Sequence, residues 1–267
     1  YPTTRRHALI GQIFELFGGE GLLRPAMHYR WNFDDVNKSF LSLDFGSSLA
    51  PTGAPEEMQA GIFAMASARM RKAMTSFGVT AESILAIEAS YAEFLRLFEA
   101  HLATSPYLLG GRPTIADYGL IAPLYAHLAR DPYPARLMQQ TAHRVWRWTE
   151  RMNRADQDAG EYGDAPEELF ADDHVPDTLM ALLRFVAEDY LPEVRAYVQF
   201  ANEWLSARPE ILSGTNGLAR TQDRVIGTTT FTWRGHPVQV AVMPYRLYLL
   251  QKIQDVADRA SPDARAN

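Results

Sequence analysis

A short run of mixed residue types, Met27-His28-Tyr29-Arg30-Trp31, places a cation and a titratable ring next to apolar side chains. Small-molecule pockets have this composition, because an apolar lining supplies affinity and a few polar groups fix the orientation of the ligand. We therefore name Met27, His28, Arg30 and Trp31 as candidate substrate-binding residues. Tyr125, on a later apolar helix, is added as a fifth candidate of the same kind.

A structural alternative remains open for this run. In it, Met27 and Trp31 belong to the hydrophobic core, and His28 is a polar surface residue. Arg30 then forms an ion pair with Asp34 or Asp35, which follow it closely in the chain.

Other motifs that could carry chemistry are weaker. Asp172, Asp173, His174 and Asp177 could ligate a hard cation, but they lie in an acidic, proline-flanked stretch that favours a solvated connection. The histidines show no H-x-x-x-H pair, and the chain has neither a G-x-S-x-G elbow nor a P-loop. We therefore predict no metal site in this chain and assign no catalytic residue to it.

Composition limits the function classes further. The 267 residues carry a formal charge of −6 and contain no cysteine. The negative charge argues against a nucleic-acid partner, which requires a basic surface to neutralise phosphates. No apolar run reaches the length that spans a bilayer, so we expect no membrane partner. The absence of cysteine removes disulfides and thiolate nucleophiles and fits a cytoplasmic setting.

Hydrophobic periodicity predicts a mainly helical chain. One expected helix carries the apolar positions from Leu9 to Phe17, and a second lies in the region of Met27. Further helices are expected over about 55–77, 80–103 with Thr80 as N-cap, 114–130 and 135–153. Residues 32–54 lack a sustained period and are predicted to form a loop. Residues 156–176 are acidic and are predicted to form a linker. A helical stretch follows, in which Pro192 either kinks the helix or starts a second one.

One β-hairpin is expected near residues 228–242. Apolar residues alternate on both sides of an Arg234-Gly235 turn, at Phe231 and Trp233 and again at Val238 and Val240. Residues 207–226 are expected to form a loop, and a last helix is predicted to start near Pro244.

The stretch "LGGRPTIAD", residues 109–117, contains a capping box. Thr114 precedes an apolar helical pattern and Asp117 follows three residues later, so each side chain can bind the backbone N–H of the other. A catalytic role for Asp117 is the alternative, and capping explains the spacing better. The helix that follows is apolar on more than one face, which predicts that other helices surround it.

The same stretch closely resembles the signature of the glutathione transferase C-terminal domain, in which a loop of the form L-x-G-x-x-P-[ST]-x-A-D caps a central buried helix. The resemblance implies an all-α helical bundle over residues 1–155. Residues 156–176 are then the linker, and residues 177–260 form a helical extension with the hairpin, which the common architecture lacks.

The resemblance also implies a function. In this family a thioredoxin-like domain binds glutathione and supplies the catalytic side chain, and the helical domain holds the electrophile and much of the homodimer contact. Nothing in this chain resembles the thioredoxin-like domain, so we expect either a protein seen without it or a relative that lacks it. The alternative function is a non-catalytic protein-interaction or ligand-binding module built on the same bundle.

Overall fold

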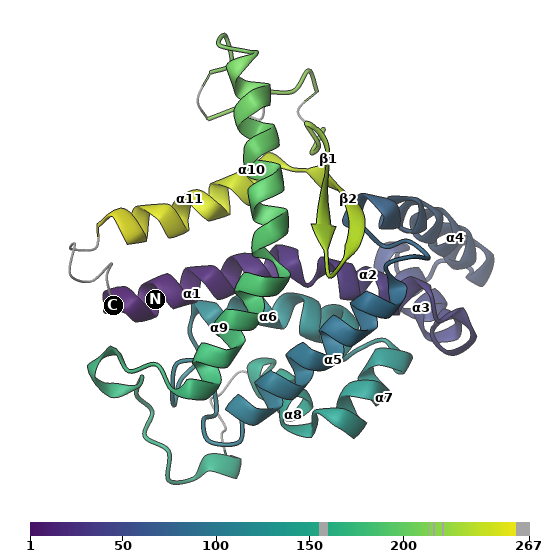
Figure 1. Ribbon diagram of the computed structural model, residues 1–267. Helices are drawn as coiled ribbons and strands as arrows, with labels where there is room; N and C mark the ends of the chain where they lie inside the picture. The colour runs from purple at the N-terminus through teal and green to yellow at the C-terminus, as the bar shows by residue number, and fades with distance from the viewer. Residues whose placement is uncertain (155–159, 213, 216, 221, 260–267) are drawn as a thin grey trace.

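The computed structural model describes residues 1–154, 160–212, 214–215, 217–220 and 222–259. Within these ranges the chain is mostly helical with one antiparallel strand pair (Figure 1), as predicted. The elements are α1 (Arg5–Leu16), α2 (Leu23–Trp31), α3 (Asp34–Leu49), α4 (Glu56–Ala73), α5 (Ile84–His101), α6 (Ile115–Pro123), α7 (Pro132–Thr141), α8 (His143–Met152), α9 (Asp177–Asp189), α10 (Leu191–Ser206), β1 (Gly227–Trp233), β2 (His236–Val242) and α11 (Pro244–Asp258). None of the helices in these ranges is both long and apolar enough to cross a lipid bilayer.

Helix α6 lies in the middle of the bundle and crosses the first helical segment very closely. A Cβ atom on Gly18 would lie 2.3 Å from the carbonyl oxygen of Gly119, and one on Gly119 would lie 2.4 Å from the Cα atom of Glu15. Only glycine fits at both positions. Gly18 belongs to a π-helical turn, Phe17–Gly21, which continues α1, and Leu22, with φ of −82° and ψ of 1°, separates this turn from α2.

The glycine pair before α6 has a similar packing role. Gly111 donates its N–H to the carbonyl oxygen of Glu168 at 2.7 Å, and a Cβ atom on Gly111 would collide with the carbonyl oxygen of Pro166. Phe170 in turn donates to the carbonyl oxygen of Leu109 at 3.0 Å. The acidic segment therefore runs along the capping loop and is hydrogen-bonded to it.

The hairpin forms in the predicted place, with Phe231 opposite Val238. Its turn residues Arg234 and Gly235 have φ of 47° and 84°, the left-handed conformation that two-residue hairpin turns require. Arg234 is not a glycine, and two ion pairs hold its side chain, at 2.7 Å to Asp189 and 2.9 Å to Glu93.

Two clusters of buried side chains form the core. The larger one joins the bundle to α9, α10 and α11, because Phe94 and Leu120 share it with Phe185 and Tyr197. The smaller one lies between α2, α3, α4 and the hairpin. The division into bundle, linker and extension stays a prediction, and residues 155–159 at its junction lie outside the described ranges.

Three predictions of local structure were wrong. Residues 34–49 form helix α3 instead of a loop, because Leu41 and Gly46 pack inward while Ser39, Ser47 and Ser48 are exposed. Helix α5 begins at Ile84, since Ser83 forms a turn by bonding the carbonyl oxygens of Gly78 and Thr80. The single helix expected over 135–153 is divided at Ala142, whose φ of −147° and ψ of 65° are not helical.

Candidate functional site

The predicted pocket residues Met27 and Trp31 lie on α2 and are both buried in the smaller core cluster. The Arg71 guanidinium lies 5.0 Å from the centroid of the Trp31 ring and donates to the Trp31 carbonyl oxygen at 2.8 Å. Both side chains are therefore core residues, as the structural alternative predicted.

Arg30 forms a buried ion pair, but not with the partners expected. Its Nε and Nη2 atoms donate to the two carboxylate oxygens of Asp131 at 2.7 and 2.8 Å, and Nη2 also donates to the Ala126 carbonyl oxygen at 2.6 Å. The expected partner Asp34 lies at the exposed start of α3 and pairs with Arg71 at 2.5 Å. Arg30 points inward from α2, toward the start of α7, and fixes that junction.

His28 is buried, with 1% of its surface exposed, so its predicted surface position was wrong. Its Nε2 atom lies 3.1 Å from a carboxylate oxygen of Glu88, and its Nδ1 atom lies 2.8 Å from the side-chain amide nitrogen of Asn32. Burial lowers the pKa of His28, although the Glu88 carboxylate acts in the opposite direction. The ring is thus neutral near pH 7, and its two neighbours favour the tautomer in which Nε2–H donates to Glu88.

Tyr125 lies in a second π-helical turn, Leu124–Leu128, and is partly buried. His127 of the same turn has a buried Nδ1 atom without a hydrogen-bond partner among the described residues. Burial, with the nearby Arg30 charge, lowers the pKa of His127 to about 3. None of the five candidate residues lines the three cavities described next, so their role in substrate binding stays a prediction.

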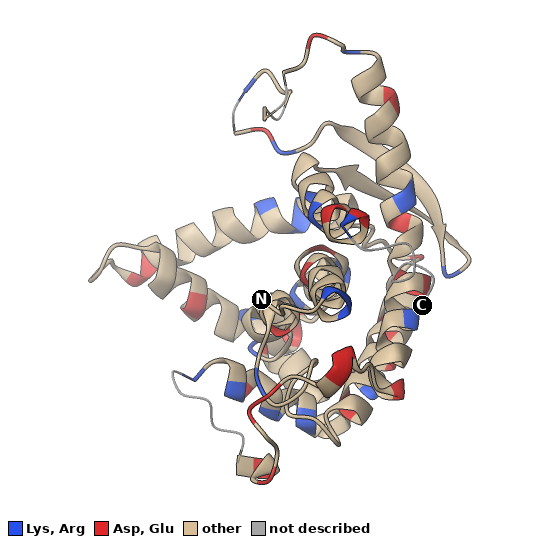
Figure 2. Ribbon diagram, turned by 90° about the vertical axis from the view of Figure 1, so that its left-hand side faces the viewer, with Lys and Arg blue, Asp and Glu red and all other residues tan. Residues whose placement is uncertain are grey.

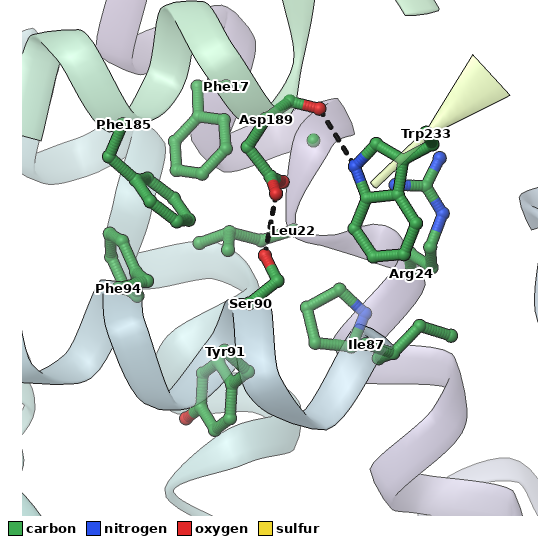
Figure 3. A pocket seen from close by; sticks show the side chains of 12 residues that line it. Phe17, Leu22, Arg24, Ile87, Ser90, Tyr91, Phe94, Phe185, Asp189 and Trp233 are labelled. Carbon is green, nitrogen blue, oxygen red and sulfur yellow. Dashed lines mark hydrogen bonds between the residues drawn. The ribbon is translucent and has the colours of Figure 1, made fainter. Parts of the chain in front are cut away.

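The first cavity lies between α2, α5, α9 and the hairpin (Figure 3). Its volume is about 10 Å³, which is room for roughly one water molecule. Ser90 donates to the Asp189 carboxylate at 2.7 Å, and the Trp233 indole donates to the Asp189 carbonyl oxygen at 3.0 Å. These bonds connect the hairpin to α9 and α5. The space is too small for a substrate.

A buried chain of four charges, which the sequence analysis did not predict, starts at Arg24, one of the residues that line this cavity. Arg24 pairs with Glu193 at 2.5 Å, Glu193 pairs with Arg246 at 2.7 Å, and Arg246 pairs with Glu20 at 2.8 Å. We call these residues the four-charge network. It connects the segment around α2 to α10 and α11, and its charges sum to zero.

Glu20 is the member of the network that also lines a second cavity, of about 350 Å³. Burial raises the pKa of Glu20, and the adjacent Arg246 guanidinium offsets only part of this effect. Met243, Pro244 and Tyr245 supply a mostly apolar wall. The size matches that of small-molecule sites, and the charged side chains of Asp223 and Arg224 line the cavity together with Glu20.

The third cavity, of about 610 Å³, is a polar basin beside α8. Arg144 pairs with Glu99 at 2.8 Å, and Arg147 pairs with Glu161 at 2.7 Å. Arg151 contacts Glu161 as well and donates to the Pro106 carbonyl oxygen at 2.9 Å. Because carboxylates already neutralise these arginines, the basin is poorly suited to bind an anion.

The capping box before α6 forms around a fully buried carboxylate. Asp117 accepts hydrogen bonds from the backbone N–H of Thr114 at 2.9 Å, from that of Leu108 at 3.1 Å and from the Trp148 indole at 3.2 Å. Burial raises the pKa of Asp117 to about 6 against the lowering effect of these bonds. The Asp117 side chain therefore holds both the start of α6 and the loop before it.

The acidic run considered as a cation site serves a different purpose. The Asp173 carboxylate accepts from the backbone N–H groups of Arg6 and His7, each at 3.0 Å, and from the Thr4 hydroxyl at 2.6 Å. Asp173 thus caps the start of α1. Across the described part of the chain, no group of three or more His, Asp or Glu side chains is arranged to hold a metal ion.

Comparison with known families agrees with this geometry over one part of the chain. Residues 79–151 match the family model of the glutathione S-transferase C-terminal domain. The match covers α5, the capping loop, α6, α7 and α8, and it includes Asp117 and its partners. No curated protein and no solved structure matches the chain.

Proposed function

We propose that this chain is the helical part of a glutathione transferase-like enzyme. The observation that carries the proposal is the family-model match over residues 79–151, within which Asp117 binds both the start of α6 and the preceding loop. That buried cap agrees with the resemblance noted in residues 109–117. The rest of the chain, including α1–α4 and α9–α11, lies outside the matched segment.

The proposed reaction is attack of the glutathione thiolate on an electrophilic carbon or a disulfide. A hydroxyl donor and nearby positive dipoles lower the pKa of the thiol in such enzymes. The resemblance places these groups on a thioredoxin-like domain, so this chain contributes no catalytic residue. We propose a cytoplasmic homodimer in which this chain holds the electrophile and part of the dimer contact.

Within this chain we propose that the electrophile lies in the cavity beside Glu20. Its apolar wall suits an electrophile with a hydrophobic body, and the Glu20 carboxyl group can meet a polar substituent. The residues first considered on α2 are already packed against other side chains. Replacing Met243 with Trp fills the cavity and is expected to raise KM for such a substrate more than it lowers kcat.

The test starts from the protein as its native cell makes it. We expect an intact mass larger than that of this chain by about one small domain, retention on immobilised glutathione, and glutathione-dependent consumption of a nitroaryl chloride. A native mass equal to that of this chain, together with no retention, would overturn the proposal. A non-catalytic binding or assembly module would then be the better description.

A further inference from the structure

The Glu20 carboxylate has one oxygen atom that is not used inside the chain. Its Oε2 atom accepts from the Nε atom of Arg246 at 2.8 Å. Among the residues that the structure describes, none donates a hydrogen bond to the Oε1 atom. The side chain keeps 11% of its surface exposed and lines the cavity of about 350 Å³. The cavity therefore presents a hydrogen-bond acceptor that a ligand can reach.

Glu20 is also the least compensated carboxylate of the four-charge network. Glu193 pairs with two guanidinium groups, whereas Glu20 pairs only with that of Arg246, which Glu193 shares. Burial raises the pKa of Glu20, so the arginine stabilises its negative charge only in part. A positively charged donor at Oε1 would complete this stabilisation, and a charge-assisted hydrogen bond is about twice as strong as a neutral one.

The apolar part of the cavity suits an organic cation as well. Met243, Pro244 and Tyr245 form this wall. The Tyr245 ring lies 6.1 Å from the ring of Tyr248, and each of the two residues exposes 59% of its surface. Because the face of an aromatic ring attracts a cation, a ligand with a positive group and a hydrophobic body finds a partner for each part.

The two remaining charged residues of the lining already have partners inside the chain. Asp223 and Arg224 lie on the loop between α10 and β1, where acidic and basic residues are close together (Figure 2). Asp223 pairs with Arg220 at 2.9 Å, and Arg224 donates to the Asp223 carbonyl oxygen at 3.3 Å. Selection between ligands therefore depends mainly on Glu20, which a ligand anion approaches as a like charge.

We propose that the cavity beside Glu20 binds a primary amine with a hydrophobic body. The ammonium group donates to the Oε1 atom of Glu20, and the body packs against the apolar wall around Tyr245. The inference rests on the proposed function for the place of the electrophile and names its class, an electrophile that carries an amine. The lining residues lie outside the segment that matches the glutathione S-transferase C-terminal domain.

A series of similar small molecules tests the ligand class. We expect phenethylamine to bind the 267-residue chain with a Kd of about 0.1–1 mM in isothermal titration calorimetry. Phenethyl alcohol donates without a charge, so it should bind about tenfold more weakly, and hydrocinnamate should not bind. Equal Kd values for the amine and the alcohol, or no binding of the amine at about 10 mM, overturn the proposal.

Glu20→Gln removes the charge and keeps the shape of the side chain. It is expected to raise the Kd for phenethylamine about tenfold and to change the Kd for the alcohol less than about twofold. Glu15→Gln is the matched control, since Glu15 pairs with Lys252 at 2.8 Å and lines none of the three cavities. This variant should leave both Kd values unchanged. A Glu20→Gln variant that still prefers the amine contradicts the proposal.

Met243→Trp fills the cavity and leaves the four-charge network intact, so it decides the question if Glu20→Gln does not fold. It is expected to abolish binding of phenethylamine, and unchanged binding overturns the proposal. The reaction is tested separately on the native protein with two nitroaryl chlorides, one with an aminomethyl and one with a hydroxymethyl substituent. Amine binding without glutathione-dependent consumption of either compound overturns only the proposed function. Consumption with equal KM values overturns only the present inference.

Discussion

Two buried polar centres in this chain, the Asp117 cap and the four-charge network, have hydrogen-bond partners of different kinds. Asp117 accepts from the backbone N–H groups of Thr114 and Leu108, which lie within nine residues of it, and from the side chains of Thr114 and Trp148. Glu193 of the network binds two guanidinium groups, from Arg24 and Arg246, that lie 169 and 53 residues away in the chain. The first centre holds a local backbone turn, and the second joins distant segments through ion pairs between side chains.

This difference in partners decides whether the polar groups of a centre can be replaced by apolar residues. The donors around Asp117 include backbone N–H groups, which every residue except proline keeps, so an acceptor must stay at that position. The charges of the network belong to side chains, so all of them can be exchanged together for apolar residues. We therefore expect single deletions to be costly in both centres, and a complete exchange to be tolerated only in the network.

The largest effect is expected for Glu193→Ala. This change leaves Arg24 and Arg246 buried with fewer carboxylates than guanidinium groups. Breaking a buried ion pair by removing one partner costs about 3–5 kcal/mol. Urea unfolding followed by circular dichroism measures the loss. A loss below about 1 kcal/mol, the value of a surface pair, would show that water reaches the network.

Asp117→Ala is expected to cost somewhat less, about 2–4 kcal/mol, because it leaves the buried donors of Leu108, Thr114 and Trp148 unpaired. The same unfolding experiment measures it. Glu168→Ala is the matched control, since this exposed residue binds Gly111 through its backbone and its side chain is not needed for that bond. Equal losses for the two variants would contradict a special role of the Asp117 carboxylate.

A complete exchange of the network should cost less than the single change at its centre. The variant combines Glu20→Leu, Arg24→Met, Glu193→Leu and Arg246→Met. We expect it to lose about 1–2 kcal/mol, because Arg24 and Arg246 also donate to the carbonyl oxygens of Phe77 and Ala241, which then lack these donors. A larger loss than that of Glu193→Ala would show that the charges stabilise the fold beyond satisfying one another.

The smallest effect is expected in the pH dependence of stability. The folded pKa of Asp117, about 6, lies above its ordinary value of 3.8, so its contribution to stability decreases as the pH rises from 4 to 6. Burial lowers the pKa of His101 from 6.5 to about 4, so its contribution decreases as the pH falls through the same window. The two effects oppose each other.

Asp117→Asn removes one of these opposing contributions. Its melting temperature should therefore fall more steeply between pH 6 and pH 4 than that of the wild type. Thermal melts at four pH values across this window measure the slope. Identical slopes for the two proteins would show that Asp117 does not titrate there.

The contrast between local partners, as in the Asp117 cap, and distant partners, as in the four-charge network, explains which features the sequence could predict. The Thr114 cap, the Arg234-Gly235 turn and the start of α11 at Pro244 depend on residues close together in the chain, and all three form in the structure. The break at Ala142 lacks a proline or glycine signal, so the pattern predicted one helix where packing makes two.

The candidate site was harder to predict, because burial of a polar residue depends on distant partners. Nothing near Arg30 in the sequence points to Asp131, which is 101 residues away. Glu20 lies among glycines in a π-helical turn, and only the return of α11 makes it part of a network and of a cavity wall.

The cap on α1 has a consequence for how the chain acquires its structure during synthesis. The carboxylate that binds the backbone N–H groups of Arg6 and His7 belongs to a residue 167 and 166 positions later. The ribosome adds about 5–20 residues per second. Roughly ten seconds or more therefore pass between the synthesis of α1 and that of Asp173, which caps it. Helix α1 is therefore synthesised before the other described elements, and its N-terminal cap is completed only after the segment through α8 has been made.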